Sequence, residues 1–296
     1  MNVAPLQRSK LADAELVLAD ACAFDRATEV ADEKLFGPGP SSAAQAFGAW
    51  DGNDLIGVAA VSARWLRVIA VVPRARKAGA GSALLSACEA AARAEGMDKL
   101  SALDQPGNYL APGIDERNTD AIVWLEKRGW QRAGDPRMNI LLDVRGNPRV
   151  SPQRAAELVE RAAAGGYEVR RAHANERDGL CTAIATEFGG AWPFEIERAL
   201  GYEPAGVHVA LHEGAYCGFA AHDGNNRGLG WFGPTGTWPA HRGKGLGEAL
   251  LMACLVDVGE ERSQCEVAWI GPRPFYEKVA GITSERRFVV MAKDLT

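Results

Sequence analysis

Short apolar runs and stretches with helical spacing alternate along the whole sequence. Apolar residues at i, i+3 and i+4 indicate helices, whereas compact apolar runs bounded by Gly, Pro, Asn or Asp indicate strands. These patterns predict helices over residues 10–24, 82–95, 120–128, 152–164, 176–188, 193–200, 245–258 and 274–279. They predict strands over residues 46–50, 55–62, 67–72, 99–103, 138–144, 167–171, 207–211, 216–222, 229–238, 264–269 and 288–292. The intermixed order predicts an α/β (α+β) fold with mixed sheets flanked by helices.

The most informative stretch joins a predicted strand to a predicted helix and carries Gly243, Gly245 and Gly247. Glycine lets the backbone approach a ligand closely, and the start of a helix offers free N–H groups with partial positive charge. Arg242 and Lys244 add two full charges. This combination suits a phosphate or pyrophosphate group. A strand-to-helix turn that binds nothing is the simpler alternative.

Two common phosphate loops do not fit this spacing. A P-loop requires Ser or Thr directly after its Gly-Lys pair, but Gly245 follows Lys244. A dinucleotide fingerprint requires G-x-G-x-x-G after the first strand of its domain. Here the third glycine comes one residue early, and several predicted strands precede the loop. The pattern that remains is Arg-x-x-Gly-x-Gly from Arg242 to Gly247.

The same pattern occurs a second time. The sequence Arg76-Lys77-Ala78-Gly79-Ala80-Gly81 follows an apolar run that ends at Val72, and it precedes another helix rich in alanine and leucine. Pro73 and Pro239 lie 166 positions apart, and so do Arg76 and Arg242. Two copies in register indicate a duplicated domain.

Both loops resemble the acyl-CoA pyrophosphate loop of the GNAT superfamily of N-acetyltransferases. A second pair of segments, 124–130 and 275–282, resembles the tyrosine-bearing helix near the end of GNAT domains. The resemblance covers nearly the whole chain, twice over. It implies two tandem GNAT-like domains, each with a mixed, mostly antiparallel sheet flanked by helices. We expect them at 1–146 and 147–296, because Pro, Gly and Asn within 145–152 indicate a linker.

The resemblance implies acetyl-CoA as co-substrate and an amine as acceptor. The strand before the loop is expected to hold the pantetheine arm and to polarise the thioester carbonyl. The loop and the helix start are expected to hold the pyrophosphate. The residues assigned to cofactor binding in this way are Gly236, Thr237, Trp238, Arg242, Gly243, Lys244, Gly245, Leu246, Gly247 and Glu248 in the second copy, and Val72, Arg76, Lys77, Gly79 and Gly81 in the first.

Catalysis is expected in the second copy. The leaving thiolate, with a pKa of about 8.5, needs a proton donor, and Tyr276 stands where the superfamily keeps its tyrosine. A buried aromatic residue that anchors the helix is the alternative. The first copy has Leu125 at the matching position and holds 15 extra residues between its motifs. They are expected as a loop over 105–117 or close to it, in which Tyr109 is a remote candidate for the missing proton donor.

The attacking amine must lose a proton, so a base is needed. Glu266 is the first choice because it lies on the strand after the loop helix, and His222 and Glu213 are weaker candidates. Glu266 as an ordinary surface residue of a strand is the alternative. The second copy departs from the superfamily in the segment 269–274, which carries no Asn, and in one extra residue, Ala280.

Composition narrows the class of protein further. A net charge of −5 argues against a general nucleic-acid surface. The sequence has no stretch of about 18 apolar residues, so no membrane span is predicted. The first 13 residues do not resemble a signal peptide. Six scattered cysteines form no metal pattern and indicate reduced thiols in the cytoplasm.

The expected protein is thus an acetyl-CoA-dependent N-acetyltransferase that acts on a small-molecule amine, without a metal, as a monomer or homodimer. Two alternatives stay open at this point. One is a non-catalytic CoA-binding or interaction module, and the other is an acetyltransferase for protein N-termini or lysines.

Overall fold

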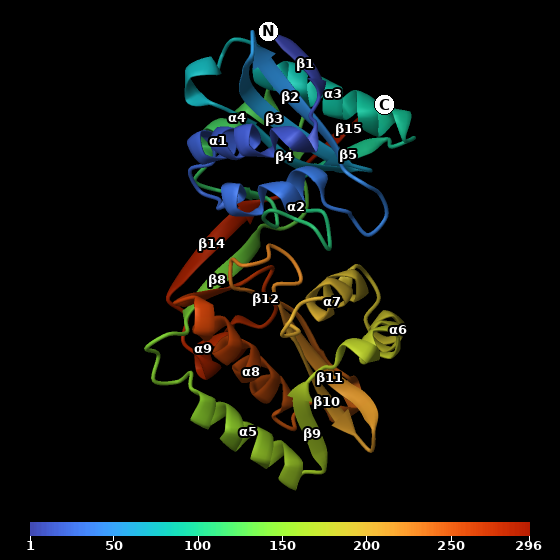
Figure 1. Cartoon of the computed structure of the whole chain (residues 1–296), viewed down its shortest axis with the longest axis vertical. Helices are drawn as coiled ribbons and strands as arrows, with labels where there is room; N and C mark the ends of the chain where they lie inside the picture. The colour runs from blue at the N-terminus through green and yellow to red at the C-terminus, as the bar shows by residue number, and fades with distance from the viewer. The chain divides into compact units, whose positions relative to one another are not determined.

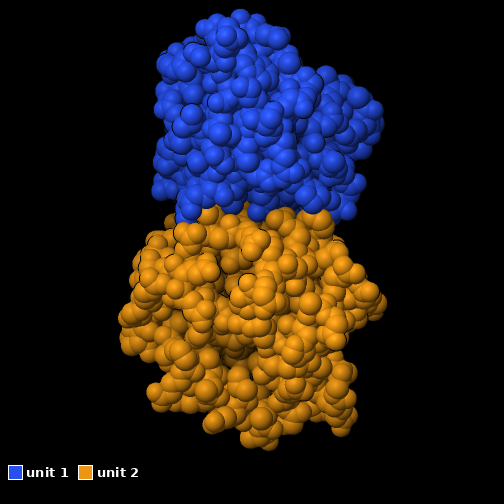
Figure 2. Space-filling view, viewed as in Figure 1, with its two compact units in different colours: residues 1–137, 287–296 blue, residues 138–286 orange.

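The computed structural model describes residues 1–296 and places them in two compact units. The first unit holds residues 1–137 and 287–296, and the second holds residues 138–286 (Figure 2). The chain therefore leaves the first unit once, completes the second, and returns for its last ten residues.

A seven-stranded sheet forms the first unit, in the order β1-β2-β3-β4-β5-β15-β7 (Figure 1). Its strands are β1 (Asn2–Pro5), β2 (Gln45–Asp51), β3 (Asp54–Ser62), β4 (Trp65–Val71), β5 (Lys99–Ala102), β7 (Gln131–Arg132) and β15 (Met291–Asp294). The pair β4–β5 is parallel, and the others are antiparallel. The helices are α1 (Leu11–Ala21), α2 (Ala31–Phe36), α3 (Ala80–Ala94) and α4 (Thr119–Glu126). Both α1 and α3 pack against β3.

The second unit has the same plan. Within it the sheet runs in the order β8-β13-β12-β11-β10-β9. Its strands are β8 (Arg137–Asp143), β9 (Tyr167–Arg171), β10 (Val207–His212), β11 (Ala215–His222), β12 (Trp231–Thr237) and β13 (Gln264–Val267). The helices are α5 (Pro152–Ala164), α6 (Arg177–Glu187), α7 (Trp192–Leu200), α8 (Leu246–Glu261) and α9 (Arg273–Val279). Only the pair β12–β13 is parallel.

Successive side chains along the strands of this sheet pack alternately into two separate hydrophobic cores. On one face Ala210 and Phe232 join the buried residues of α8, such as Leu250. On the other face Val209 packs with the buried residues of α6 and α7, such as Ile184. The sheet is therefore covered on both faces, because its side chains point alternately to either side.

The strands at the ends of the two predicted domains are exchanged. The segment 138–144 was expected to close the first domain, but β8 pairs with β13, and its Ile140 is fully buried in the second unit. The last strand, β15, instead lies between β5 and β7 of the first unit, where Met291 is fully buried. The units thus divide the chain differently from the expected boundary after residue 146. An apolar strand pattern specifies that a strand is buried, but it does not specify in which of two similar sheets.

The single strand expected at 288–292 is divided in the structure between two strands, β14 (Ser284–Val289) and β15. The strand β14 starts in the second unit and ends in the first, where its last residues pair with β6 (Ile114–Asp115). The predicted helices are found within a few residues of their expected ends, and both predicted hairpins are present. The sequence patterns missed the short elements β1, β6, β7 and α2.

Candidate active site in the second unit

The strand β12 separates from its parallel neighbour part-way along its length. The last residue pair between β12 and β13 joins Phe232 to Val267. On its other side β12 stays paired with β11 as far as Thr237. The backbone of residues 233–237 therefore has one open edge, and β12 and β13 form a fork with Phe232 at its base.

Alternation along β12 decides which backbone groups face the open edge of the fork. The N–H of Trp238 donates to the carbonyl oxygen of Cys217 on β11 at 2.9 Å. The N–H and C=O groups of successive residues point to opposite sides of a strand. Those of Thr235 and Thr237 consequently face the open edge, whereas those of Gly236 face β11.

The glycine loop follows directly and ends at the first turn of α8. Gly243 and Gly245 have φ angles of 75° and 82°, which other residues adopt only with strain. The N–H groups from Gly243 to Gly247 make no hydrogen bond within the chain. The N–H of Glu248, in contrast, already donates to the Gly245 carbonyl at 3.1 Å, and its carboxylate pairs with Arg154 at 2.7 Å. Five adjacent amides at the positive end of a helix are thus available to an anion.

Arg242 holds the loop in place. Its Nε donates to the carbonyl oxygen of Thr237 at 3.1 Å, so the side chain ties the loop back to the end of β12. Gly236 is fixed by packing, because a Cβ there would lie 2.8 Å from Cζ of Phe188 and 2.9 Å from Cε1 of Phe219.

Tyr276 lies at the base of the fork. It is 4% exposed, and its ring centroid is 6.4 Å from that of Phe232 in an edge-on arrangement. Its hydroxyl has no hydrogen-bond partner in the chain. Burial is the main cause that raises the pKa of Tyr276 to about 12, and the nearby Cys265 side chain adds to it. The phenol therefore keeps its proton at neutral pH and can donate a hydrogen bond.

Glu266 lies on the opposite face of the same sheet. Its neighbours Cys265 and Val267 belong to the core that contains Tyr276, so strand alternation points Glu266 the other way. Its Oε1 accepts from Asn139 at 2.6 Å and from Arg286 at 3.2 Å. These two partners, one of them 127 positions away in the sequence, were not visible in the sequence patterns.

The weaker base candidates lie elsewhere. His222 ends β11 and is held between two carboxylates, at 3.0 Å from Asp223 through Nδ1 and 3.3 Å from Asp257 through Nε2. Asp257 also contacts His208 at 2.7 Å. Glu213 lies in the exposed turn between β10 and β11. His222 is thus part of a half-buried ionic cluster at the start of the segment that leads into β12.

The first unit repeats the fork and the loop. Pairing of β4 with β5 ends at Leu66 and Ala102, and Arg76 Nε donates to the Val71 carbonyl at 3.1 Å. This bond matches the one made by Arg242 in both its atoms and its length. The N–H of Val72 donates to Ile56, as that of Trp238 does to Cys217.

The surroundings of the first loop differ from those of the second. Lys77 takes the left-handed conformation, with φ of 64°, that Gly243 has in the second copy. A Cβ on Gly81 would lie 3.1 Å from the Trp124 ring, so this glycine is needed for packing. Leu125 occupies the tyrosine position and is 2% exposed. The residue that matches Tyr276 therefore supplies no phenol to the first fork.

A buried polar network fills one face of the first unit. Arg67 of β4 is fully buried and donates to the Gln105 side chain and to the Gly37 carbonyl. Lys34 of α2, 1% exposed, donates to Asn108 at 2.8 Å. The extra segment 105–117 thus buries polar side chains within the unit. The only feature of the sequence that pointed to this network was Arg67, a charged residue within a predicted apolar strand.

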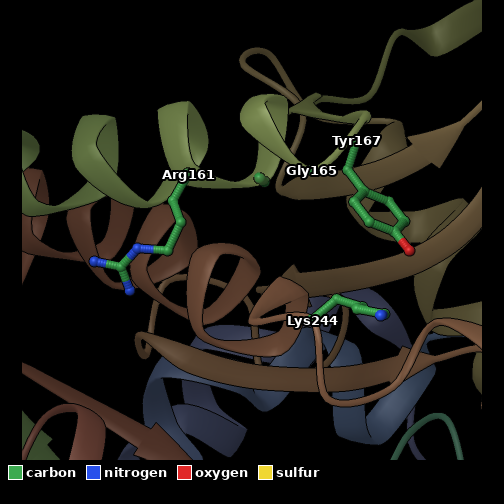
Figure 3. Close-up of a pocket in the computed structure, with 5 residues that line it drawn as sticks. Arg161, Gly165, Tyr167 and Lys244 are labelled. Carbon is green, nitrogen blue, oxygen red and sulfur yellow. The ribbon is translucent and has the colours of Figure 1, made fainter.

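A pocket of about 180 Å³ borders the loop of the second unit. Its walls are formed by Arg161, Ala162 and Gly165 at the end of α5, by Tyr167 of β9 and by Lys244 of the loop (Figure 3). Figure 3 shows Lys244 and Tyr167 at one end and Arg161 at the other. The sequence patterns did not connect α5 with the loop.

No group of His, Cys, Asp and Glu side chains in the structure is arranged to hold a metal ion. None of the helices has the length and apolar character that a bilayer crossing needs. All six cysteines are free thiols.

The model of the acetyltransferase (GNAT) family matches residues 18–129 and 177–282, which together make up well over half of the chain. The chain belongs to the acetyltransferase (GNAT) family. The two matched ranges confirm the tandem domains predicted from the paired motifs. Membership of the GNAT family supports acyl-CoA-dependent N-acetyl transfer as the general activity, with acetyl-CoA as the co-substrate. No curated protein matches the sequence significantly.

Solved GNAT structures resemble the chain over its whole length. A glucosamine N-acetyltransferase region of a fungal multi-domain GH3 β-N-acetylglucosaminidase superposes with a TM-score of 0.78 at 16% identity, over 98% of this chain and 38% of that one. A tandem GNAT protein from the clavulanic acid biosynthesis pathway has a TM-score of 0.70 at 17% identity, over 100% and 98% of the two chains. A GNAT from Sphaerobacter thermophilus has a TM-score of 0.63 at 15% identity, over 99% and 95%. At these identities the likeness shows the fold alone.

Proposed function

We propose that the second unit transfers the acetyl group of acetyl-CoA to the amine of a small molecule by direct attack. The observation that carries the proposal is the Tyr276 phenol, which has no partner in the chain and lies at the base of the open fork. The amides from Gly243 to Gly247 bind the pyrophosphate. The pantetheine arm then runs along the open edge of β12 toward the phenol.

The amine nitrogen bonds to the acyl carbon as the carbon–sulfur bond breaks. Tyr276 donates a hydrogen bond to the departing sulfur and passes its proton as the thiol forms. Its pKa of about 12 makes it a weaker acid than a thiol, so stabilisation of the developing thiolate is its first contribution. Glu266, on the other face of the sheet, accepts the proton of the amine directly or through water.

The first unit is proposed to be non-catalytic. Leu125 offers no proton at the base of its fork, and the Arg67 network packs the face that corresponds to the Glu266 side. Its loop keeps the arginine contact of the second copy, which supports a structural or CoA-holding role.

Replacement of Tyr276 by Phe tests the mechanism in the full-length chain. We expect kcat to fall by about 100-fold while the Kd for acetyl-CoA stays within about twofold, because only the proton donor is lost. Glu266→Gln is expected to lower kcat/KM at neutral pH and to recover part of it as the amine deprotonates at higher pH. Release of CoA is measured with a thiol reagent across a panel of small amines, with Tyr202→Phe as the control.

Three outcomes decide between the alternatives. Full activity of Tyr276→Phe would overturn the role of the phenol. Turnover with peptides that carry a free N-terminus or a lysine, together with no turnover on small amines, would show that the acceptors are proteins and not small molecules. Tight CoA binding with no turnover on any acceptor would make the chain a binding module.

A further inference from the structure

Asn139 of β8 connects the Glu266 carboxylate to the turn that follows β13. Its side chain is fully buried, and its Nδ2 donates to Oε1 of Glu266 at 2.6 Å. Its Oδ1 accepts from the backbone N–H of Trp269 at 2.9 Å. Both ends of one amide are therefore used, as a buried polar group requires. A single side chain thus fixes two points of the neighbouring segment that lie three residues apart.

The Glu266 carboxylate receives donors from two other strands. Besides the amide of Asn139, Nη1 of Arg286 on β14 donates to the same oxygen, Oε1, at 3.2 Å. Glu266 itself lies one residue before Val267, at which the pairing across the fork ends. A glutamate has several rotatable bonds, so a carboxylate without support spreads over many positions. Two donors on one oxygen give this carboxylate a defined position beside the base of the fork.

The bond to Trp269 supports a strained turn. Trp269 has φ of 50°, which a bulky residue adopts only with strain. The next N–H, that of Ile270, donates to the Met138 carbonyl at 3.0 Å. The chain thus stays attached to β8 through the turn, although regular pairing of β13 with β8 ends at Val267. This bond is the structural role that Asn139 would have without the bond to Glu266.

The first unit lacks both members of the Asn139–Glu266 pair. Ser101 holds the position of Glu266, because each comes one residue before the pairing across its fork ends. The partner of Glu266 on the next strand lies two residues after Asn139, and the partner of Ser101 lies two residues after Val290. Val290 is apolar and 7% exposed, so it offers no side-chain donor. The amide and the carboxylate are therefore both confined to the unit that carries the phenol.

We propose that Asn139 is a positioning residue for the reaction, whose amide holds the Glu266 carboxylate where it accepts the proton of the acceptor amine. Asn139 acts through Glu266, so the inference rests on the proposed function of Glu266 as the base. An amide suits this task because it donates a hydrogen bond without adding a charge to the site. The base must lie within hydrogen-bond reach of the amine or of a bridging water, which a fixed carboxylate ensures.

Steady-state kinetics of the full-length chain test the inference. Asn139→Asp keeps the acceptor for Trp269 and removes the donor to Glu266, whereas Asn139→Leu removes both bonds without adding a charge. Each is expected to lower kcat/KM for the amine by about tenfold at neutral pH, with the Kd for acetyl-CoA within about twofold. In a Glu266→Gln background the same changes should lower kcat/KM by less than about twofold, because the carboxylate through which they act is already gone.

Asn147→Asp is the matched control in the same unit. The Nδ2 of Asn147 donates to the carbonyls of Asp143 and Ala280, and its Oδ1 accepts from the Arg149 N–H. The substitution therefore also removes donors and keeps an acceptor. It is expected to lower the melting temperature and to leave kcat/KM within about twofold. The loss in Asn139→Leu should shrink as the pH approaches the amine pKa of about 10, because a neutral amine needs no base.

The two hypotheses fail in different ways. A wild-type chain that acetylates no amine, or a Glu266→Gln variant with full activity, overturns the function proposed for Glu266 and the inference with it. If Glu266→Gln is impaired, full activity of Asn139→Asp overturns the inference alone and leaves Asn139 with the Trp269 turn. Losses at Asn139 that are equally large in the wild-type and Glu266→Gln backgrounds overturn it as well.

Discussion

One side-chain contact appears in both units with the same atoms. Arg76 and Arg242 each bond through Nε to the carbonyl five residues earlier, at 3.1 Å in both cases. A guanidinium used in this way ties the loop to the strand before it and leaves the backbone amides of the loop without partners in the chain. The repeated sequence spacing of 166 positions was therefore a reliable guide to these residues. It was no guide to Glu266, whose partners Asn139 and Arg286 come from distant segments.

His222 is predicted to make stability depend on pH. Burial alone lowers its pKa, but hydrogen bonds with Asp223 and Asp257 outweigh burial and raise the pKa to about 9, against 6.5 for the free side chain. A histidine of this kind stabilises the fold fully below about 6.5, and the contribution is lost as pH rises through about 9. His208 and Arg171 also face Asp257 and complete the cluster.

The variant His222→Gln isolates this effect. At pH 6.5 we expect it to melt roughly 5 °C below the wild-type chain. The gap should narrow progressively up to pH 9.5, because wild-type His222 is then neutral as well. Melting followed by circular dichroism at several pH values measures the gap, and a gap that widens with pH would contradict the assignment.

At the scale of elements, the fork is the feature that positions the site. The strand β12 keeps its hydrogen bonds to β11 and loses its pairing with β13 after Phe232. Apart from the Thr237 carbonyl, which accepts from Arg242, the backbone groups that face the open edge have no partner strand. Unpaired groups of this kind are expensive unless water or a ligand satisfies them. Sequence patterns located the strand and the helix on either side of the loop. They could not show where two strands part, because pairing depends on residues of another strand.

Hydrogen exchange tests the assignment of the open edge. In the free chain the amides of Thr235 and Thr237 should exchange faster than those of Gly236 and Trp238, which bond to β11. Saturating acetyl-CoA should slow Thr235 and Thr237 by about tenfold or more, because they gain partners. Residue-resolved exchange by NMR measures this, with Ala220 in the interior of β11 as an internal control. Protection that appears at Gly236 instead would place the cofactor differently.

The whole molecule is organised by the path of the chain between its units. The first unit needs β15, which lies between β5 and β7 and buries Met291. A cut after residue 146 therefore removes a strand from the first sheet and leaves β8 attached to the wrong fragment. Local patterns predicted these strands but not their exchange, since an apolar strand such as 138–144 suits either sheet equally.

Two fragments of the chain test this organisation. Residues 1–146 alone are expected to aggregate or to unfold without a cooperative transition. Residues 1–137 joined to 287–296 by a flexible glycine–serine linker should fold and melt cooperatively, because every strand of the first sheet is restored. Circular dichroism and size-exclusion chromatography compare the two. Equal stability of both fragments would show that β15 is dispensable.

The return of the chain to its first unit also sets an order of events during synthesis. Domains commonly fold one after another as they leave the ribosome, beginning at the N-terminus. Here the gap between β5 and β7 stays unfilled until the last ten residues have emerged, whereas residues 138–286 are complete before then. The half that is translated first is the half that is finished last.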